Sequence, residues 1–262
     1  MLAYVIVCLV AFFVAALTLF SGFGLGTLLM PAFALFFPVT VAVAATAVVH
    51  LANNLFKAAL IGRQADWGVL LRFALPGAAA AILGAWLLAL LARTPPLAVY
   101  YLAGRLHEVT VVKLVIAGLI IFFALFDLSP RLNRLAFDRK YLVLGGALSG
   151  FFGGLSGNQG ALRSAVLVKC GLDKEAFIGT GVMAAVVVDV ARLLVYGLAF
   201  YTASFTVLEA NAWGLVIAAT LAAFTGSFIG RRLLKKVTLH AVQVTVGVML
   251  ILLGIGIGAG LI

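Results

Sequence analysis

The sequence contains little charge and few acidic residues. Of its 262 residues only 10% are charged, eight are Asp or Glu, and 65% are hydrophobic. Soluble domains carry roughly 25% charged residues, so this composition excludes an ordinary soluble protein. A membrane span needs about 20 apolar residues. The length therefore allows roughly six to nine spans and leaves no room for a soluble domain.

Cysteine is nearly absent, and the residue patterns of several kinds of chemistry are missing. Cys8 and Cys170 lie far apart in apolar surroundings and form no motif, so we interpret both as packing residues. No His, Cys, Asp and Glu cluster has metal-ligand spacing, no Walker loop occurs, and no nucleophile–base constellation is visible. We expect no enzymatic activity, no cofactor and no metal site.

Positive charge is in excess, with a net charge of +10. In a soluble protein this excess would suggest nucleic acid. Here the cations cluster in short loops, where the positive-inside rule of membrane topology explains them better. We expect no nucleic-acid partner.

Eight apolar segments can be recognised, and two of them are interrupted by glycine. They cover residues 2–37, 39–61, 69–91, 111–128, 141–168, 175–200, 212–229 and 239–262. The interruptions are SGFGLG at 21–26 and SGNQG at 156–160. Residues 1–20 lack a basic start and a small-residue cleavage site, so we expect a retained membrane segment and no signal peptide.

The two halves of the chain correspond at an offset of 135 residues. This offset aligns Ser21 with Ser156, and it also pairs two sets of polar residues, which are scarce inside spans. These sets are Asn54 with Asp189 and Lys57 with Arg192. We predict an all-α polytopic membrane protein with a 4+4 inverted repeat. Its parts are an N-terminal transmembrane repeat (1–129), a cytoplasmic linker (130–140) and a C-terminal transmembrane repeat (141–262).

Basic residues in the loops distinguish two topologies. If each broken segment crosses the membrane once, the fifteen cations outside the spans divide nine against six, which is a poor bias. If each broken segment enters and returns as a re-entrant hairpin, they divide twelve against three, as the positive-inside rule predicts. Three crossings per half then invert the second repeat. We expect a multi-pass protein of the bacterial inner membrane with both termini extracytoplasmic.

The two breaks are the predicted binding site for a substrate. Glycine lets the backbone approach a ligand closely, and the helix N-termini that follow each break favour an anion. Arg163 lies in the first turn after the second break, where the first half has Leu28. The alternatives are close helix packing for the glycines and snorkelling to the cytoplasmic face for Arg163. The candidate substrate-binding residues are Ser21, Gly22, Phe23, Gly24, Asn54, Lys57, Ser156, Gly157, Asn158, Gln159 and Arg163.

Three further polar residues are candidates for coupling or gating. Asp189 precedes Arg192 by three residues and shares its helix face. An internal ion pair and a proton-sensitive carboxylate beside the transport site are both compatible with this spacing. His50 begins a polar stripe that leads to Lys57, and it is either a hydrogen-bonded core residue or a proton carrier.

Two stretches of the sequence resemble the TauE/SafE family of sulfite exporters. They are residues 21–55 and 145–182, each with a Gly-rich break, an apolar stretch, a short loop and an Ala-rich span. Pro31 and Pro38 fit the pattern in the first copy, and Thr180 and Gly181 fit it in the second. The second copy departs from the pattern with Val166 where Pro31 stands in the first. The resemblance implies movement of sulfite, sulfoacetate or related organosulfur anions, driven by ion or proton gradients.

Together, these features predict a secondary transporter for a small anion. The anionic charge of the substrate follows from the helix N-termini and Arg163, whereas its sulfur chemistry follows only from the resemblance. An anion channel, a carrier for a non-sulfur carboxylate, a membrane-embedded enzyme and an accessory membrane protein are the alternatives. The expected partners are the anionic substrate and the lipid bilayer, and the chain could also form a homodimer.

Overall fold

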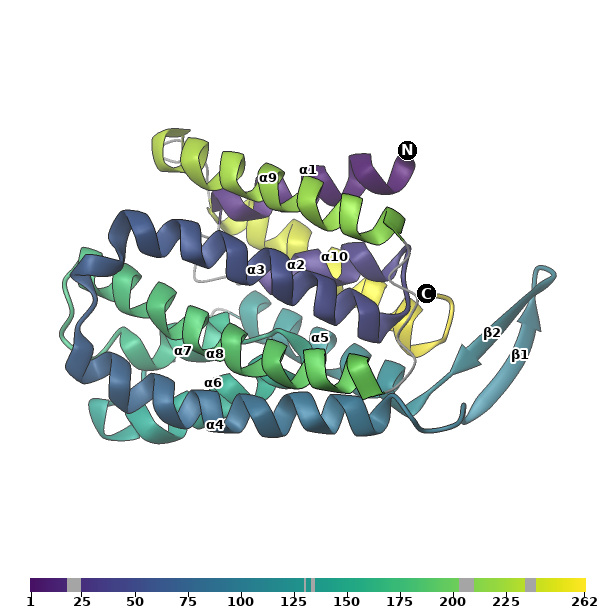
Figure 1. Cartoon of the computed structure of the whole chain (residues 1–262), viewed down its shortest axis with the longest axis horizontal. Helices are drawn as coiled ribbons and strands as arrows, with labels where there is room; N and C mark the ends of the chain where they lie inside the picture. The colour runs from purple at the N-terminus through teal and green to yellow at the C-terminus, as the bar shows by residue number, and fades with distance from the viewer. Residues whose placement is uncertain (18–24, 130, 133–134, 203–209, 234–238) are drawn as a thin grey trace.

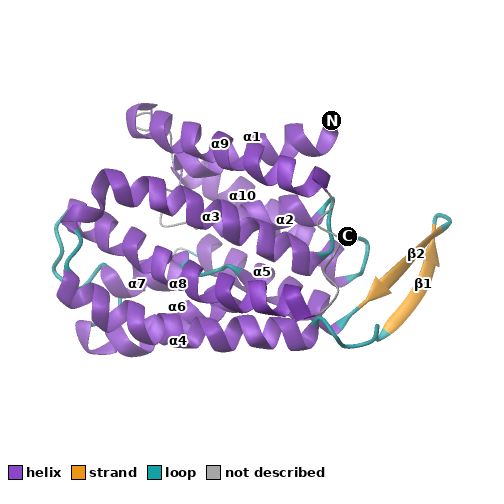
Figure 2. Ribbon diagram, viewed as in Figure 1, coloured by secondary structure: helices purple, strands orange, loops and turns teal. Residues whose placement is uncertain are grey.

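The structure is a computed structural model that describes residues 1–17, 25–129, 131–132, 135–202, 210–233 and 239–262. Most of these residues form helices (Figures 1 and 2). The first half contains α1 (Leu2–Leu17), α2 (Leu25–Ala34), α3 (Val39–Ile61), α4 (Trp67–Leu91) and α5 (Val111–Leu128). The second contains α6 (Leu142–Ser156), α7 (Gly160–Leu167), α8 (Lys174–Thr202), α9 (Ala210–Leu233) and α10 (Leu239–Gly258). Short 3-10 turns, Gly62–Gln64 and Arg139–Tyr141, follow α3 and precede α6.

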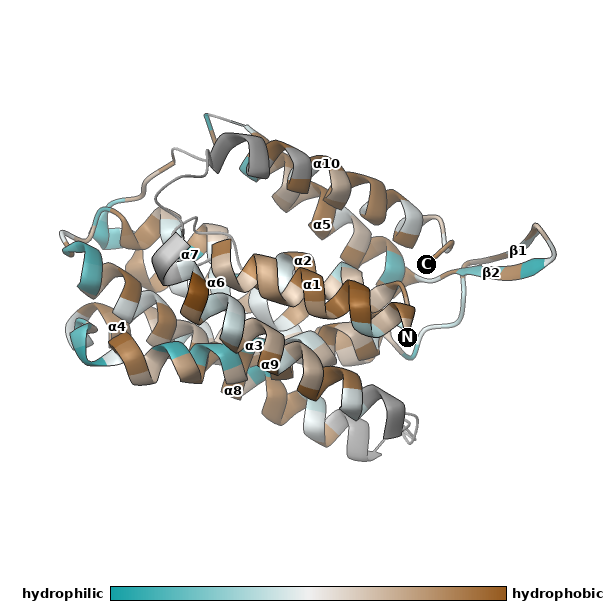
Figure 3. Cartoon of the chain, turned by 90° about the horizontal axis from the view of Figure 1, so that it is seen from above, coloured by the Kyte–Doolittle hydropathy of each residue, from teal (hydrophilic) through white to brown (hydrophobic). Residues whose placement is uncertain are grey.

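The helices have the length and the surface of a membrane protein. Five of them, α3, α4, α5, α8 and α9, contain stretches long and apolar enough to cross a membrane. Large apolar side chains such as Leu75, Leu83 and Trp86 of α4 point outwards and are exposed. Hydrophobic residues dominate the helices in Figure 3, while hydrophilic ones gather in the loops. A lipid-facing surface requires this pattern, so the fold is that of an all-α membrane protein.

The observed helices correspond closely to the predicted segments. Helices α3 and α5 have the predicted bounds, and the second break falls between Ser156 and Gly160. The first break, which includes Ser21, Gly22, Phe23 and Gly24, lies outside the described residues.

A β-hairpin between α4 and α5 was not predicted. Strands β1 (Ala98–Leu102) and β2 (Arg105–Val109) pair antiparallel and project from the bundle (Figure 1). Ala103 and Gly104 both have positive φ, 51° and 76°, as a two-residue type I′ turn requires. The predicted segments leave residues 92–110 without a regular element, whereas the residues around His107 form a strand. The available signal was the β-branched and aromatic run Val99, Tyr100 and Tyr101 before Ala-Gly.

Glycine brings α4 and α6 into backbone contact. A Cβ atom added at Gly146, Gly150 or Gly154 of α6 would collide with carbonyl groups of α4, those of Phe73, Gly77 and Ala81. Small residues spaced by four allow this close approach in membranes. This close packing concerns glycines of α6 that precede the second break, whereas Gly157 in the break itself has a left-handed φ of 84°.

The two ends of the helix bundle contain different structural elements. Both termini and the β-hairpin lie at one end (Figure 1). Tyr100 of β1 donates a hydrogen bond to the Ala259 carbonyl there, at 2.5 Å. At the opposite end the α3–α4 turn is held to α8, because the Asp66 amide donates to Thr180 Oγ1 at 2.9 Å. The linker before α6 lies at this end too, with the Phe137 amide bonded to the Ala165 carbonyl at 2.9 Å.

Candidate functional site

Polar side chains meet inside the bundle where α3 and α8 pack beside the α6–α7 break. All of the residues in this group have less than 9% of their surface exposed. Buried polar groups are costly without partners, so a cluster of this size marks either a structural network or a binding site. The members are His50, Asn53, Asn54, Lys57, Ser156, Asn158, Gln159, Asp189 and Arg192.

Asp189 is the centre of the network and is fully buried. Its Oδ1 accepts hydrogen bonds from Arg192 Nη2 at 2.7 Å and from Gln159 Nε2 at 3.1 Å. Its Oδ2 lies 2.6 Å from His50 Nδ1 and accepts a hydrogen bond from Asn54 Nδ2 at 3.3 Å. Side chains from α3, α8 and the break therefore converge on one carboxylate, and they connect the two halves of the chain.

Arg192 is engaged through all three of its guanidinium nitrogens. Besides its bond from Nη2, Nε donates to Asp189 at 3.0 Å, and Nη1 donates to the Gly153 carbonyl at 3.1 Å. Tyr196, one turn further along α8, donates to the neighbouring Gly154 carbonyl. These two side chains thus add hydrogen bonds to carbonyl groups in the last turn of α6, where a helix runs out of its own donors; the Gly153 carbonyl also accepts from the Gly157 amide at 3.0 Å. Arg192 and Asp189 form the internal ion pair that was one of the two predicted interpretations.

Side-chain and backbone bonds also fix the break itself. Ser149 of α6 donates to the Gln159 carbonyl at 2.9 Å. Ser156 donates to the Phe152 carbonyl at 3.0 Å and accepts from Asn158 Nδ2 at 3.2 Å. Because the chain turns through Gly157 in a left-handed conformation, α7 starts directly from this bonded corner.

Arg163 differs from Arg192 because part of its guanidinium has no partner. It lies in the first turn of α7, and its amide is bonded to the Gln159 carbonyl at 3.2 Å. Its Nη1 is buried and makes no hydrogen bond with the described residues, and the same holds for Asn158 Oδ1. Its Nε lies 3.6 Å from the position that a Cβ at Gly181 of α8 would take. The side chain therefore faces α8, and it does not extend away from the bundle as a snorkelling arginine would.

Lys57, a member of this group, and the segment that follows the first break are the remaining predicted positions. Lys57 is buried near the end of α3, within electrostatic range of Arg163. The start of α2 lies directly against the second break, since a Cβ added at Gly26 would come 2.8 Å from the Gly157 carbonyl oxygen.

The sequence of the whole chain then identifies its family. The model of the sulfite exporter TauE/SafE family matches residues 7–257. The chain belongs to the TauE/SafE family. A search of curated proteins and a search of solved structures gave no match. All the site residues fall inside the TauE/SafE match, and TauE/SafE proteins are membrane transporters.

Three residues around this candidate site were missed by sequence reasoning. Ser149 and Tyr196 hold the break, and Ser227 of α9 donates to Asn53 Oδ1 at 2.8 Å. Tyr196 could have been found, because it follows Arg192 by four residues and so shares its helix face. Ser149 and Ser227 carry no such signal, since serine is also common at plain packing contacts between membrane helices.

Thr46 adds a further polar atom on the same helix as His50. Its hydroxyl is buried without a hydrogen-bond partner among the described residues, as is Nδ2 of Asn53. In the part of the chain that the structure describes, no group of three or more His, Cys, Asp and Glu residues could hold a metal ion. The site therefore offers hydrogen bonds and positive charge to a ligand.

Proposed function

We propose that the protein is a secondary transporter that moves a small anion across the bacterial inner membrane. The anion binds between the two glycine-broken segments, and Arg163 provides its counter-charge. The observation that carries this proposal is the buried Nη1 of Arg163, which has no partner among the described residues. Buried donors in proteins are nearly always satisfied, so a ligand atom is the natural partner for this one.

Asn158 narrows the chemistry of the ligand. Its side-chain oxygen is the second unpartnered atom at the break, and it needs a donor, whereas Arg163 needs an acceptor. A singly protonated oxyanion such as hydrogensulfite has both, because it carries negative oxygens and one hydroxyl hydrogen. The family description supports sulfite or a related organosulfur anion as the substrate.

We further propose that the fold is a 4+4 inverted repeat with re-entrant first segments, made of residues 1–129 and 141–262. Helices α2 and α7 begin 135 residues apart, as do α3 and α8. Helix α1 packs on α9, and α6 packs on α4. Because α1 corresponds to α6 and α4 to α9 in the order of the two repeats, a two-fold axis would exchange these two pairs. Asn54 and Asp189, equivalent at this offset, contact each other, and equivalent residues can meet only near the axis. Both termini lie at one end of the bundle, as an even total number of crossings requires (Figure 1), and we propose that this end is extracytoplasmic.

The contact between His50 and Asp189 is our proposed coupling element. It joins α3 to α8 at 2.6 Å, and these helices belong to different repeats. A proton that enters or leaves this pair changes the net charge beside Arg163, because His50, Asp189 and Arg163 lie within electrostatic range of one another. Transport driven by a proton gradient would use this change, with Arg192 holding the carboxylate in place.

Exchange of labelled sulfite in liposomes tests the proposed function. The membrane potential is clamped at zero with valinomycin and equal potassium on both sides. Liposomes that contain a carrier and are loaded with unlabelled sulfite then take up external label faster than empty liposomes, whereas liposomes that contain a channel show no such acceleration. We expect acceleration with the wild type, its loss with Arg163→Ala, and its retention with Arg72→Ala, which removes an exposed cation of α4. Acceleration by a simple carboxylate but not by sulfite would indicate a carboxylate carrier. Equal uptake with loaded and empty liposomes would contradict transport by a carrier.

A further inference from the structure

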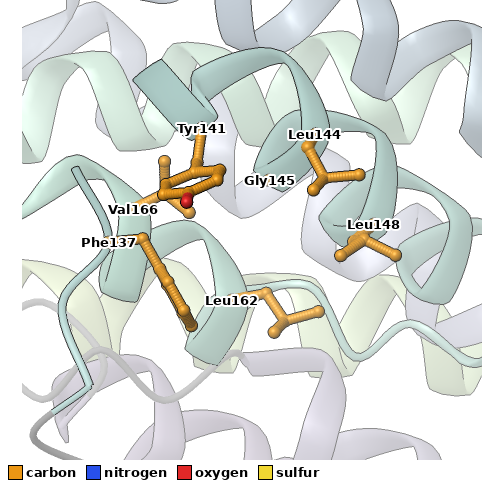
Figure 4. A pocket seen from close by; sticks show the side chains of 7 residues that line it. All are labelled: Phe137, Tyr141, Leu144, Gly145, Leu148, Leu162 and Val166. Atoms are coloured by element: carbon orange, nitrogen blue, oxygen red, sulfur yellow. The ribbon is translucent and has the colours of Figure 1, made fainter. Parts of the chain in front are cut away.

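An apolar pocket opens on the outer surface where the linker meets α6 and α7. Its volume is about 370 Å³, within the range of small-ligand sites. Figure 4 shows its seven lining residues, which are Phe137 of the linker, Tyr141, Leu144, Gly145 and Leu148 around the start of α6, and Leu162 and Val166 of α7. Phe137, Tyr141, Leu144 and Leu148 are exposed, whereas Gly145 and Val166 are buried. The pocket therefore faces lipid and is separate from the buried site around Asp189.

Positive charge borders the pocket at the end of the bundle. Arg139 and Lys140 immediately precede Tyr141 and are exposed. Lys140 Nζ lies 5.1 Å from the centre of the Tyr141 ring, which lines the pocket. Phe137 and Tyr141 pack edge to face at 6.4 Å, and aromatic residues with basic neighbours mark the membrane–water interface. An apolar cavity with cations at its mouth has the charge distribution that an anionic lipid complements.

We propose that this pocket binds an anionic phospholipid, with one acyl chain against Leu144, Leu148 and Leu162 and the headgroup beside Arg139 and Lys140. A zwitterionic lipid would fill the pocket equally well but would gain less from the two cations. Leu162 is adjacent to Arg163 in the chain, so the lipid would support the short helix that carries the proposed counter-charge.

The experiment compares binding of phosphatidylglycerol and of phosphatidylcholine, with identical chains, to the purified full-length protein by native mass spectrometry. Each cation near an anionic headgroup is expected to raise the binding affinity about fivefold. The two cations together therefore predict roughly a thirtyfold preference for phosphatidylglycerol over phosphatidylcholine. The double variant Arg139→Gln/Lys140→Gln should lose this preference. The matched double variant Arg93→Gln/Arg105→Gln, at the opposite end of the bundle, should keep it.

Filling the pocket tests the acyl-chain part of the proposal. Leu148→Trp should reduce binding of both lipids, and Leu144→Trp provides a second variant at an exposed position if the first fails to fold. Leu221→Trp, an exposed leucine of α9, is the control that should leave binding unchanged. Equal binding of the two lipids to the wild type would overturn the proposal. So would a pocket variant that binds lipid normally but loses a dimer visible in the same spectra, because the occupant would then be a second copy.

Discussion

The two arginines at the α6–α7 break have opposite environments. Arg192 on α8 has every nitrogen bonded, to Asp189 and to the end of α6. Arg163 on α7 has one nitrogen buried without a partner among the described residues. A guanidinium whose three nitrogens are all bonded to the protein is held in place, whereas a nitrogen without such a bond is available to a ligand. The contrast indicates that Arg192 stabilises the break, whereas Arg163 is available to a ligand there.

The largest effect on stability should come from removing the Arg192 guanidinium. Arg192→Ala leaves Asp189 buried without its main counter-charge, and removal of one partner of a buried pair costs about 3–5 kcal/mol. We expect a large fall in the apparent unfolding temperature in detergent, whatever ligand is present. The double variant Asp189→Leu/Arg192→Met should recover part of the loss, since replacement of both charges by apolar groups is often tolerated. If Arg192→Ala unfolds at the wild-type temperature, the Asp189–Arg192 ion pair does not stabilise the fold.

A smaller effect is expected from the corner that Arg192 supports. Gly157→Ala forces a side chain into the left-handed region at φ 84°, which costs about 1–2 kcal/mol. The new Cβ would also lie 3.3 Å from Arg192 Nη1. Gly118→Ala is the control, because a Cβ at Gly118 of α5 meets no described atom within 4 Å. Thermal unfolding of both variants should show a loss for Gly157→Ala alone, and equal stability would argue against a strained corner.

Most of the fold could be predicted from the sequence because membrane spans leave few choices. An apolar run in lipid must satisfy its backbone as a helix, so α3 and α5 matched their segments residue for residue. Ser-Gly at 156–157 ended α6 where predicted, since glycine alone adopts the left-handed conformation easily. The hairpin around Ala103 and Gly104 was missed because two strands of five residues give a weak signal beside long apolar runs.

The candidate site was predicted as a set of residues but not as a network. Asn54 and Asp189 were linked by the repeat offset, and the structure brings them into contact. The bonds from Arg192 and Tyr196 to the carbonyls of Gly153 and Gly154 could not be anticipated. They depend on how α8 packs against α6, and this packing is set by contacts between segments far apart in the chain.

Affinity for sulfite in the Arg163→Ala variant tests the central claim most directly. Charge-assisted hydrogen bonds contribute about 1.5–3 kcal/mol, so calorimetry should show a loss of affinity of roughly tenfold to a hundredfold, while the unfolding temperature without ligand stays near that of the wild type. Arg163→Lys should recover only part, because an ammonium cannot form the planar two-pronged contact of a guanidinium. Unchanged sulfite affinity in a folded Arg163→Ala protein would contradict the assignment of Arg163 as the counter-charge of the substrate.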